Sequence, residues 1–192
     1  QAAYYGGGFC RNHIFWSKEH TEQMVRLYRQ RFEHYGHGAA DQAIVGLGGQ
    51  VFMGETEAAA KRQFRPYFDN APVYGHGPSL EDFAEMTPLT VGTPEQVIER
   101  TLGFADYAGD YQRQLFLVDH AGLPIEVVLE QIEILGREVV PVLRAEFERR
   151  RPAHVPSDPP THATLVAAGP DSPHHLVEPA RASATNPEEV TA

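Results

Sequence analysis

Apolar residues recur at helical spacing in the first part of the chain. Between Ser17 and Tyr35 they follow one another at steps of three and four, which gives one apolar face on a helix (Met24, Val25, Tyr28, Phe32 and Tyr35). Glycines at positions 36 and 38 follow directly, and glycine is the usual residue just past a helix end. The pattern therefore predicts an amphipathic helix over residues 17–35.

Two further segments are apolar without a regular alternation of polar residues. They cover residues 43–53 and 114–119. Strands that are covered on both faces, as in a parallel sheet, read as continuous apolar runs of this kind. We predict a buried strand in each segment, and we interpret Ala2 to Tyr5 as the remnant of an earlier strand.

Several helix starts are marked by capping residues. Thr56 and Ser79 are predicted N-caps, the second for a short helix that ends near Met86. Thr93-Pro94-Glu95-Gln96 combines an N-cap threonine, proline at the first helical position and glutamine at the third, for a helix that ends at Gly109.

The last long helix is predicted to begin at Pro124 and to bend near Pro141, because the proline ring crowds the carbonyl of Arg137. Its expected buried stripe is a row of seven aliphatic residues (Ile125, Val128, Leu129, Ile132, Leu135, Val139 and Val142). Leu115 and Leu117 of the second apolar strand are expected in the same core as this helix, together with Val97, Ile98 and Leu102.

The predicted order of elements is β-α-β-α-(α)-α-β-α. Strands that alternate with helices indicate right-handed βαβ units and a parallel sheet. At most three strands are visible, whereas open doubly wound sheets have five or six and a (β/α)₈ barrel has eight. The first residue is Gln1 rather than methionine, so we expect the chain to be the end of something larger.

The composition changes near residue 151. The segment 152–192 holds eight of the chain's 15 prolines and few large apolar residues, so it cannot bury enough apolar area to offset the entropy cost of ordering. We predict an ordered domain over residues 1–150 and a disordered, proline-rich tail over 151–192.

Charge and composition exclude several functions. Lys and Arg number 16 against 26 Asp and Glu, a net charge of −10, which argues against binding to nucleic acid or to an anionic membrane surface. No apolar run is long enough to span a bilayer. The single cysteine, Cys10, cannot form an internal disulfide, which fits a reducing compartment and predicts a cytoplasmic protein.

An ordered set of segments resembles the luciferase-like flavin monooxygenase family. It begins with Phe52 to Ala59 and with Val91-Gly92-Thr93-Pro94-Glu95-Gln96-Val97. It continues with Gln114 to Leu117, Gly122-Leu123-Pro124 and Leu135 to Pro141. The order and spacing resemble the C-terminal half of that family's barrel over residues 2–147. The resemblance implies an α/β fold that is the C-terminal part of a (β/α)₈ barrel of the TIM type.

The resemblance also implies an activity. The implied protein is a monooxygenase that uses reduced FMN and O₂ on a small organic substrate. A flavin reductase is its expected partner, and assembly as a homo-oligomer is left open. Two alternatives stay open: a hydride-transferring oxidoreductase that uses coenzyme F420, and a non-catalytic half-barrel that pairs with another chain. In the family, the first half of the barrel supplies most contacts to the flavin phosphate, and no residues here correspond to it.

Candidate site residues follow from barrel topology, because active sites lie at the carboxyl ends of barrel strands. The expected strand end at Tyr4, Tyr5, Gly6, Gly7 and Gly8 is the candidate contact to the flavin ring, against the alternative of a flexible turn.

Two other strand ends offer weaker candidates. Gly48 to Phe52 could admit a ligand or form a bulge. His120 is the weak catalytic candidate, as an acid, a base or a hydrogen-bond donor, against the alternative of a solvated loop histidine. No His or Cys pattern has zinc spacing, so no metal is expected. The long loop from Asp69 to Met86 is interpreted as part of a lid or as an ordinary surface excursion.

Overall fold

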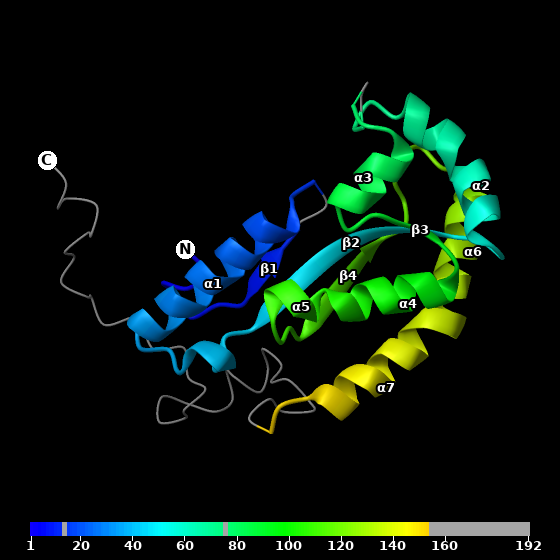
Figure 1. Ribbon diagram of the computed structural model, residues 1–192. Helices are drawn as coiled ribbons and strands as arrows, with labels where there is room; N and C mark the ends of the chain where they lie inside the picture. Colours follow the sequence, from blue (N-terminus) through cyan, green and yellow to red (C-terminus); the bar gives the residue numbers. More distant parts are fainter. Residues whose placement is uncertain (13–14, 75–76, 154–192) are drawn as a thin grey trace, which may run out of the picture.

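The computed structural model describes residues 1–12, 15–74 and 77–153. Helices and strands alternate along most of this chain (Figure 1). The elements in order are β1 (Phe9–Arg11), α1 (Lys18–His34), η1 (Ala40–Gln42), β2 (Val45–Met53), α2 (Glu57–Asn70), α3 (Leu80–Met86), β3 (Thr90–Gly92), α4 (Pro94–Gly103), α5 (Ala105–Ala108), β4 (Arg113–Leu117), α6 (Ile125–Ile134), the π-helical turn η2 (Leu135–Val139) and α7 (Val140–Arg150).

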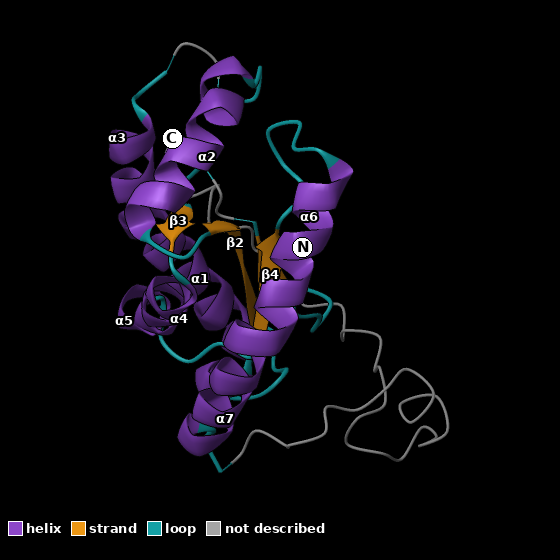
Figure 2. Ribbon diagram, turned by 90° about the vertical axis from the view of Figure 1, so that its right-hand side faces the viewer, coloured by secondary structure: helices purple, strands orange, loops and turns teal. Residues whose placement is uncertain are grey.

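The four described strands form one parallel sheet around β2. Strand β1 pairs with Val45 to Leu47, and β4 pairs with Gly46 to Gln50, so these two strands lie on opposite edges of β2. The short β3 pairs with Val51 to Met53, and Figure 2 shows it across β2 from β4. The parallel α/β sheet confirms the predicted class, while the strands of the described residues do not close into a barrel.

The predicted helix starts are confirmed at three positions. The hydroxyls of Thr56, Ser79 and Thr93 each accept a hydrogen bond from the backbone N–H three residues later. At Thr93, the side chain of Gln96 also accepts from the N–H of the cap residue, which completes the predicted capping box. These local signals need no tertiary partner, which is why the sequence alone identifies them.

All nine residues of β2 are buried, as predicted for a strand with covered faces. Val45 and Leu47 pack on one face with residues of α1 and α5, and Val51 and Met53 extend that face towards α4 and α7. Phe52 points to the other face, into an aromatic core built by α2 and α3. In its amino-terminal half, β2 places only the glycines Gly46 and Gly48 on this second face.

The prediction that β4 is buried on both faces is wrong. Exposure alternates along the strand, and Leu115 and Leu117 are 51% and 38% exposed. They share a face with Gly48 and Gln50, their register partners on β2. Helices cover the opposite face, on which Phe116 packs. The two leucines are exposed because α2 and α3 cover this face only further along, at Phe52, and no described element packs over the leucines themselves.

The predicted buried stripe of the last helix is also largely wrong. Val128 and Val139 are buried, and Leu135 is partly buried. The helix turns its inward side along Val128, Gln131 and Val139, so a neighbouring row is exposed instead (Ile125, Leu129, Ile132 and Val142). A polar residue, Gln131, occupies a buried position that the apolar pattern did not anticipate.

The beginning of the chain differs from prediction as well. Residues 2–5 form turns rather than a strand, and the first strand is Phe9–Arg11. The three residues of β3 were not predicted as a strand, because so short a run carries no periodicity. The helix expected to run to Gly109 is broken at Phe104 into α4 and α5, and Gly109 caps the second piece with a positive φ of 68°.

The distortion expected at Pro141 is present as a π-helical turn. Residues Leu135–Val139 form η2 directly before α7, in which Pro141 occupies the first turn. A wider turn relieves the clash of the proline ring with the preceding carbonyl and accommodates its missing N–H.

No helix within 1–12, 15–74 and 77–153 is long and apolar enough to cross a membrane. Nearly all of the predicted disordered tail lies outside the described residues.

Candidate functional site

A buried hydrogen-bond network lies at the carboxyl end of β4. His120 follows this strand and is 7% exposed. Its Nδ1 lies 2.8 Å from the hydroxyl of Tyr74, and its Nε2 lies 3.1 Å from the carbonyl oxygen of Val51. The Tyr74 hydroxyl accepts a hydrogen bond from Gln50 Nε2 at 2.9 Å. Three segments far apart in the sequence therefore meet here, and the expectation of a solvated loop histidine is wrong.

The partners of His120 fix its protonation state. A carbonyl oxygen only accepts hydrogen bonds, so Nε2 carries the proton that it donates to Val51. Nδ1 is then the acceptor for the Tyr74 hydroxyl. Burial lowers the pKa of His120 below its ordinary value, because the cationic form would lose its hydration; the Val51 carbonyl and the charge of Asp119 oppose this shift only in part. The histidine is therefore held neutral.

Aromatic rings enclose the network. Phe64 lies 5.0 Å from the His120 ring, and Phe68 stacks on Tyr74 at 4.5 Å, both measured between ring centroids. Phe83 packs edge-on against Tyr74, and the half-exposed Phe15 contacts Phe83 at 6.0 Å. Burial among these rings also raises the pKa of the Tyr74 hydroxyl well above its ordinary value. Tyr74 therefore stays a neutral donor and acceptor.

The loop interpreted as a lid or a surface excursion turns out to be anchored. Tyr74 lies within it and carries the hydroxyl that bridges β2 and His120. Ala71, Leu80 and Phe83, in or beside the same loop, are buried in the aromatic core. The described parts of this loop therefore form a fixed wall beside the carboxyl ends of the strands.

The predicted flavin contacts near the N-terminus lie elsewhere. Tyr4, Tyr5, Gly6, Gly7 and Gly8 precede β1 instead of following a strand, so they lie at the amino end of the sheet, opposite His120. His37 Nε2 is hydrogen-bonded to the Tyr4 carbonyl at 2.9 Å. The premise that these residues end a strand is wrong, because the strand remnant is a turn. Their binding to a flavin stays a prediction without support from their position.

The glycine-rich candidate on β2 is a regular strand. The register between β2 and β4 runs without interruption from Gly46 to Gln50, so the alternative of a bulge is wrong at this pairing. Gln50 is 2% exposed, and its Oε1 atom has no hydrogen-bond partner in the described structure. One acceptor in the buried network therefore remains unused.

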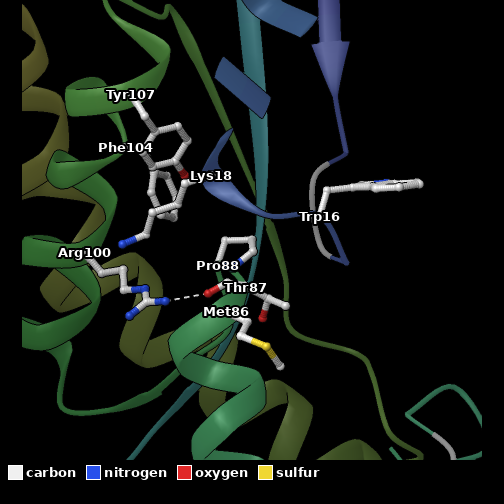
Figure 3. Close-up of a pocket in the computed structure, with 8 residues that line it drawn as sticks. All are labelled: Trp16, Lys18, Met86, Thr87, Pro88, Arg100, Phe104 and Tyr107. Atoms are coloured by element: carbon white, nitrogen blue, oxygen red, sulfur yellow. Dashed lines mark hydrogen bonds between the residues drawn. The ribbon is translucent and has the colours of Figure 1, made fainter. Parts of the chain in front are cut away.

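Two hollows are present on the described surface of the molecule. The first, with a volume of about 10 Å³, lies between α1, α3 and α4 and is shown in Figure 3, where Arg100 points at the Thr87 carbonyl. That volume holds about one water molecule. The second, of about 320 Å³, is an open groove between α1 and α5, on the side of the helices. Neither lies beside His120.

The described residues do not by themselves fit a flavin. The carboxyl ends of the strands offer exposed aromatic surface at Phe15, which suits a flat ring, whereas Phe83 and the unpartnered Gln50 Oε1 are buried. Neither of the two hollows is an enclosed cavity of the roughly 300–1,000 Å³ that ligands of this size occupy. Within the described residues, no group of three His, Cys, Asp or Glu side chains could hold a metal ion.

Sequence reasoning missed Tyr74, Gln131 and the role of Gln50. A signal was present for the two glutamines, because each interrupts an otherwise apolar strand or helix stripe. A polar residue in such a position is buried only when its hydrogen bonds are satisfied, so it marks a specific contact. Tyr74 carried no such signal, since it lies in a loop rich in proline and glycine.

Comparison with known proteins agrees with the fold. The sequence model of the luciferase-like monooxygenase family matches residues 1–111, which is more than half of the chain. The protein therefore belongs to the luciferase-like monooxygenase family. This match stops before Gly122 and Leu135, so the later segments of the resemblance lie outside it. Among curated protein sequences, none matches this chain.

Solved structures of similar fold are much longer than this chain. One is the monooxygenase RslO1 from Streptomyces bottropensis, with a TM-score of 0.55 and 16% identity over 73% of this chain and 43% of that structure. Another is the oxygenating constituent of 3,6-diketocamphane monooxygenase from Pseudomonas putida, a type II Baeyer–Villiger monooxygenase in complex with FMN. Its TM-score is 0.52, with 18% identity over 73% of this chain and 44% of that one. The chain thus spans less than half the length of these structures.

Proposed function

We propose that this chain is part of a flavin-dependent monooxygenase that uses reduced FMN and O₂ on a small organic substrate. The observation that carries the proposal is the family match over residues 1–111. The FMN bound to the Pseudomonas putida structure supports FMN as the cofactor. Because the chain spans 43–44% of the similar structures, we assign the activity to a protein in which the remaining barrel elements are present.

The residues of this chain would contribute one wall of the site. The cofactor would supply the oxygen chemistry, and the protein would bind, orient and exclude water. His120 has both ring nitrogens engaged by Val51 and Tyr74, so we assign it a positioning role rather than direct proton transfer. Phe15, which is half-exposed at this end of the sheet, would face a flat ring.

The cofactor test is spectroscopic. We expect FMN, which absorbs blue light, to stay bound when a protein that contains the remaining barrel elements is purified. If it does not, FMN should bind to that protein on titration. If F420 binds and FMN does not, the activity is instead the transfer of hydride by an F420-dependent oxidoreductase. A longer protein that binds neither would overturn the proposal. A reductase that supplies reduced FMN is the partner expected for the monooxygenase.

The 192 residues alone should bind FMN weakly and should be inert. Calorimetric titration of the purified chain checks this. Stoichiometric binding in the low micromolar range, about −8 kcal/mol, would show that these residues form a complete flavin site without further elements.

A non-catalytic half-barrel that pairs with another chain remains the second candidate. The specific observation in its favour is the exposed face of β4, where Leu115 and Leu117 lie uncovered on a parallel sheet. Parallel sheets are normally covered on both faces. If the longer protein does not change the rate at which reduced FMN is reoxidised, the non-catalytic half-barrel is favoured over the enzyme.

A further inference from the structure

The buried network around His120 contains an acceptor that it does not use. Gln50 donates from Nε2 to the Tyr74 hydroxyl at 2.9 Å, while its Oε1 has no partner among the described residues. Gln50 is buried, and a buried amide oxygen without a hydrogen bond is costly. Half a turn of the amide would place this oxygen against the Tyr74 hydroxyl, because the two ends of an amide are nearly equal in size.

The protonation state of His120 decides which way this amide can point. The neutral ring donates from Nε2 to the Val51 carbonyl, so its Nδ1 accepts the hydroxyl hydrogen of Tyr74. Tyr74 then has no hydrogen left to donate to Gln50, so Gln50 presents its N–H instead. The unused Oε1 is therefore a consequence of the neutral ring.

Protonation of His120 reverses these requirements. A proton from the solvent on Nδ1 turns that atom into a donor, and the Tyr74 oxygen accepts from it. Tyr74 keeps its own hydrogen, which turns towards Gln50, and the rotated amide accepts it at Oε1. The same two contacts of Tyr74 are kept with the opposite direction of donation. The only covalent change is the new N–H bond on the ring.

We propose that Gln50, Tyr74 and His120 form a two-state hydrogen-bond chain that reverses direction when His120 takes up a proton. The three residues lie on β2, in the loop between α2 and α3, and in the segment after β4. Because the Tyr74 hydroxyl is bonded to both partners in either state, its loop stays attached to the sheet. The wall that this loop forms therefore keeps its place across the pH range in which histidine titrates.

Few groups act on the charge of the His120 ring. Its neighbour Asp119 carries a negative charge that favours the cation, whereas burial disfavours it. The Val51 carbonyl accepts from Nε2 in both states. Helix α2 presents the uncharged ring of Phe64 to the histidine, and α3 presents a phenylalanine ring to Tyr74. Tyr74 is itself titratable, but burial raises its pKa, so its hydrogen remains in the chain.

Nuclear magnetic resonance of the full 192-residue chain tests this inference, which does not depend on the proposed flavin chemistry. The signal of the His120 ring is identified among ten histidines by its loss in His120→Gln. The ring should titrate in the folded chain, and the side-chain amide signals of Gln50 should move with the same midpoint. A chain that unfolds before His120 titrates would overturn the proposal. A Gln50 amide that does not follow the ring would do the same.

Gln50→Met tests the reversal by the sign of its effect. Without the amide, the protonated ring leaves the Tyr74 hydrogen without an acceptor, so proton binding to His120 should weaken by about tenfold and the midpoint should fall. If the amide could not rotate, the substitution would instead remove an N–H that points towards the cation. A midpoint that rises or stays unchanged would therefore contradict the proposal.

Two further variants complete the comparison. Tyr74→Phe removes the link, so the addition of Gln50→Met to it should leave the midpoint where Tyr74→Phe places it. A further fall would show that Gln50 acts on the ring by another route, against the proposal. Gln63 is exposed on α2, and Gln63→Met is the matched control that should not change the titration. Circular dichroism checks that each variant is folded, and the amide signals of the wild type decide the matter if Gln50→Met is not.

Discussion

Gln131 replaces a neighbouring strand at the end of β2 by binding both backbone groups of Met53. Its Oε1 accepts from the Met53 N–H at 2.5 Å, and its Nε2 donates to the Met53 carbonyl at 2.9 Å. Strand β4 pairs with this edge of β2 only as far as Gln50. His120 Nε2 then donates to Val51 at the same edge. Two side chains therefore continue the hydrogen bonding after β4 has ended.

Replacement of Gln131 by leucine should be strongly destabilising. The side chain is 2% exposed, and its loss leaves a buried N–H and a buried carbonyl of Met53 without partners. Each orphaned group costs about 1–3 kcal/mol, so the free energy of unfolding should fall by about 2–6 kcal/mol. Urea denaturation measures this change.

The neighbouring Glu130 provides the control for that experiment. It is exposed on the same helix, and Glu130→Ala should change stability by less than about 0.5 kcal/mol. If Gln131→Leu were as mild as Glu130→Ala, the two hydrogen bonds to Met53 would contribute nothing to the fold.

Stability should rise with pH through the range in which histidine titrates. The pKa of His120 is lowered by burial, so near its ordinary value of 6.5 the unfolded chain binds a proton that the folded chain does not. The stability contributed by the neutral ring is therefore present above about pH 6.5 and is lost as the pH falls through the lowered value. Thermal melting from about pH 5 to pH 8 measures this slope.

His120→Gln should flatten that pH dependence, because glutamine does not titrate. An unchanged slope in His120→Gln would show that the buried ring is not the group responsible.

Core position rather than residue type should decide the cost of losing a leucine. Leu47 is fully buried on β2, and Leu47→Ala should cost about 2–5 kcal/mol. Leu27 is 43% exposed on α1, so the same substitution there should cost less than about 1 kcal/mol. Guanidinium denaturation of both variants makes the comparison. Equal costs would contradict the placement of β2 at the centre of the sheet.

The end of the sheet at which a flavin binds can be found with two exposed aromatic residues. Phe15 lies near the carboxyl edge and is 50% exposed, while Tyr5 lies at the amino end and is 64% exposed. In the longer protein, Phe15→Ala should weaken FMN binding by about three- to tenfold, the effect of one aromatic contact. Tyr5→Ala should have no effect. Quenching of FMN fluorescence gives both affinities, and the opposite result would restore the residues before β1 as the flavin contact.

Some features of the fold are determined by local sequence. The caps at Thr56, Ser79 and Thr93 and the helix of α1 depend on hydrogen bonds and spacing within a few residues. The apolar run of β2 also suffices to predict a buried strand. All nine of its residues are buried, so the sequence does not have to show which face is exposed to solvent. These features, with the family resemblance, were enough to predict a parallel α/β protein of the luciferase-like family.

The tertiary structure alone decided which apolar residues are buried and where the candidate site lies. Leu115 and Leu117 look like core residues in the sequence, but burial depends on whether another element packs over those positions, and none of the described elements does. Tyr74 and His120 are 46 positions apart, so only the folded chain brings their side chains together. A local pattern specifies how a segment is shaped, whereas contacts between distant segments depend on the packing of the whole sheet.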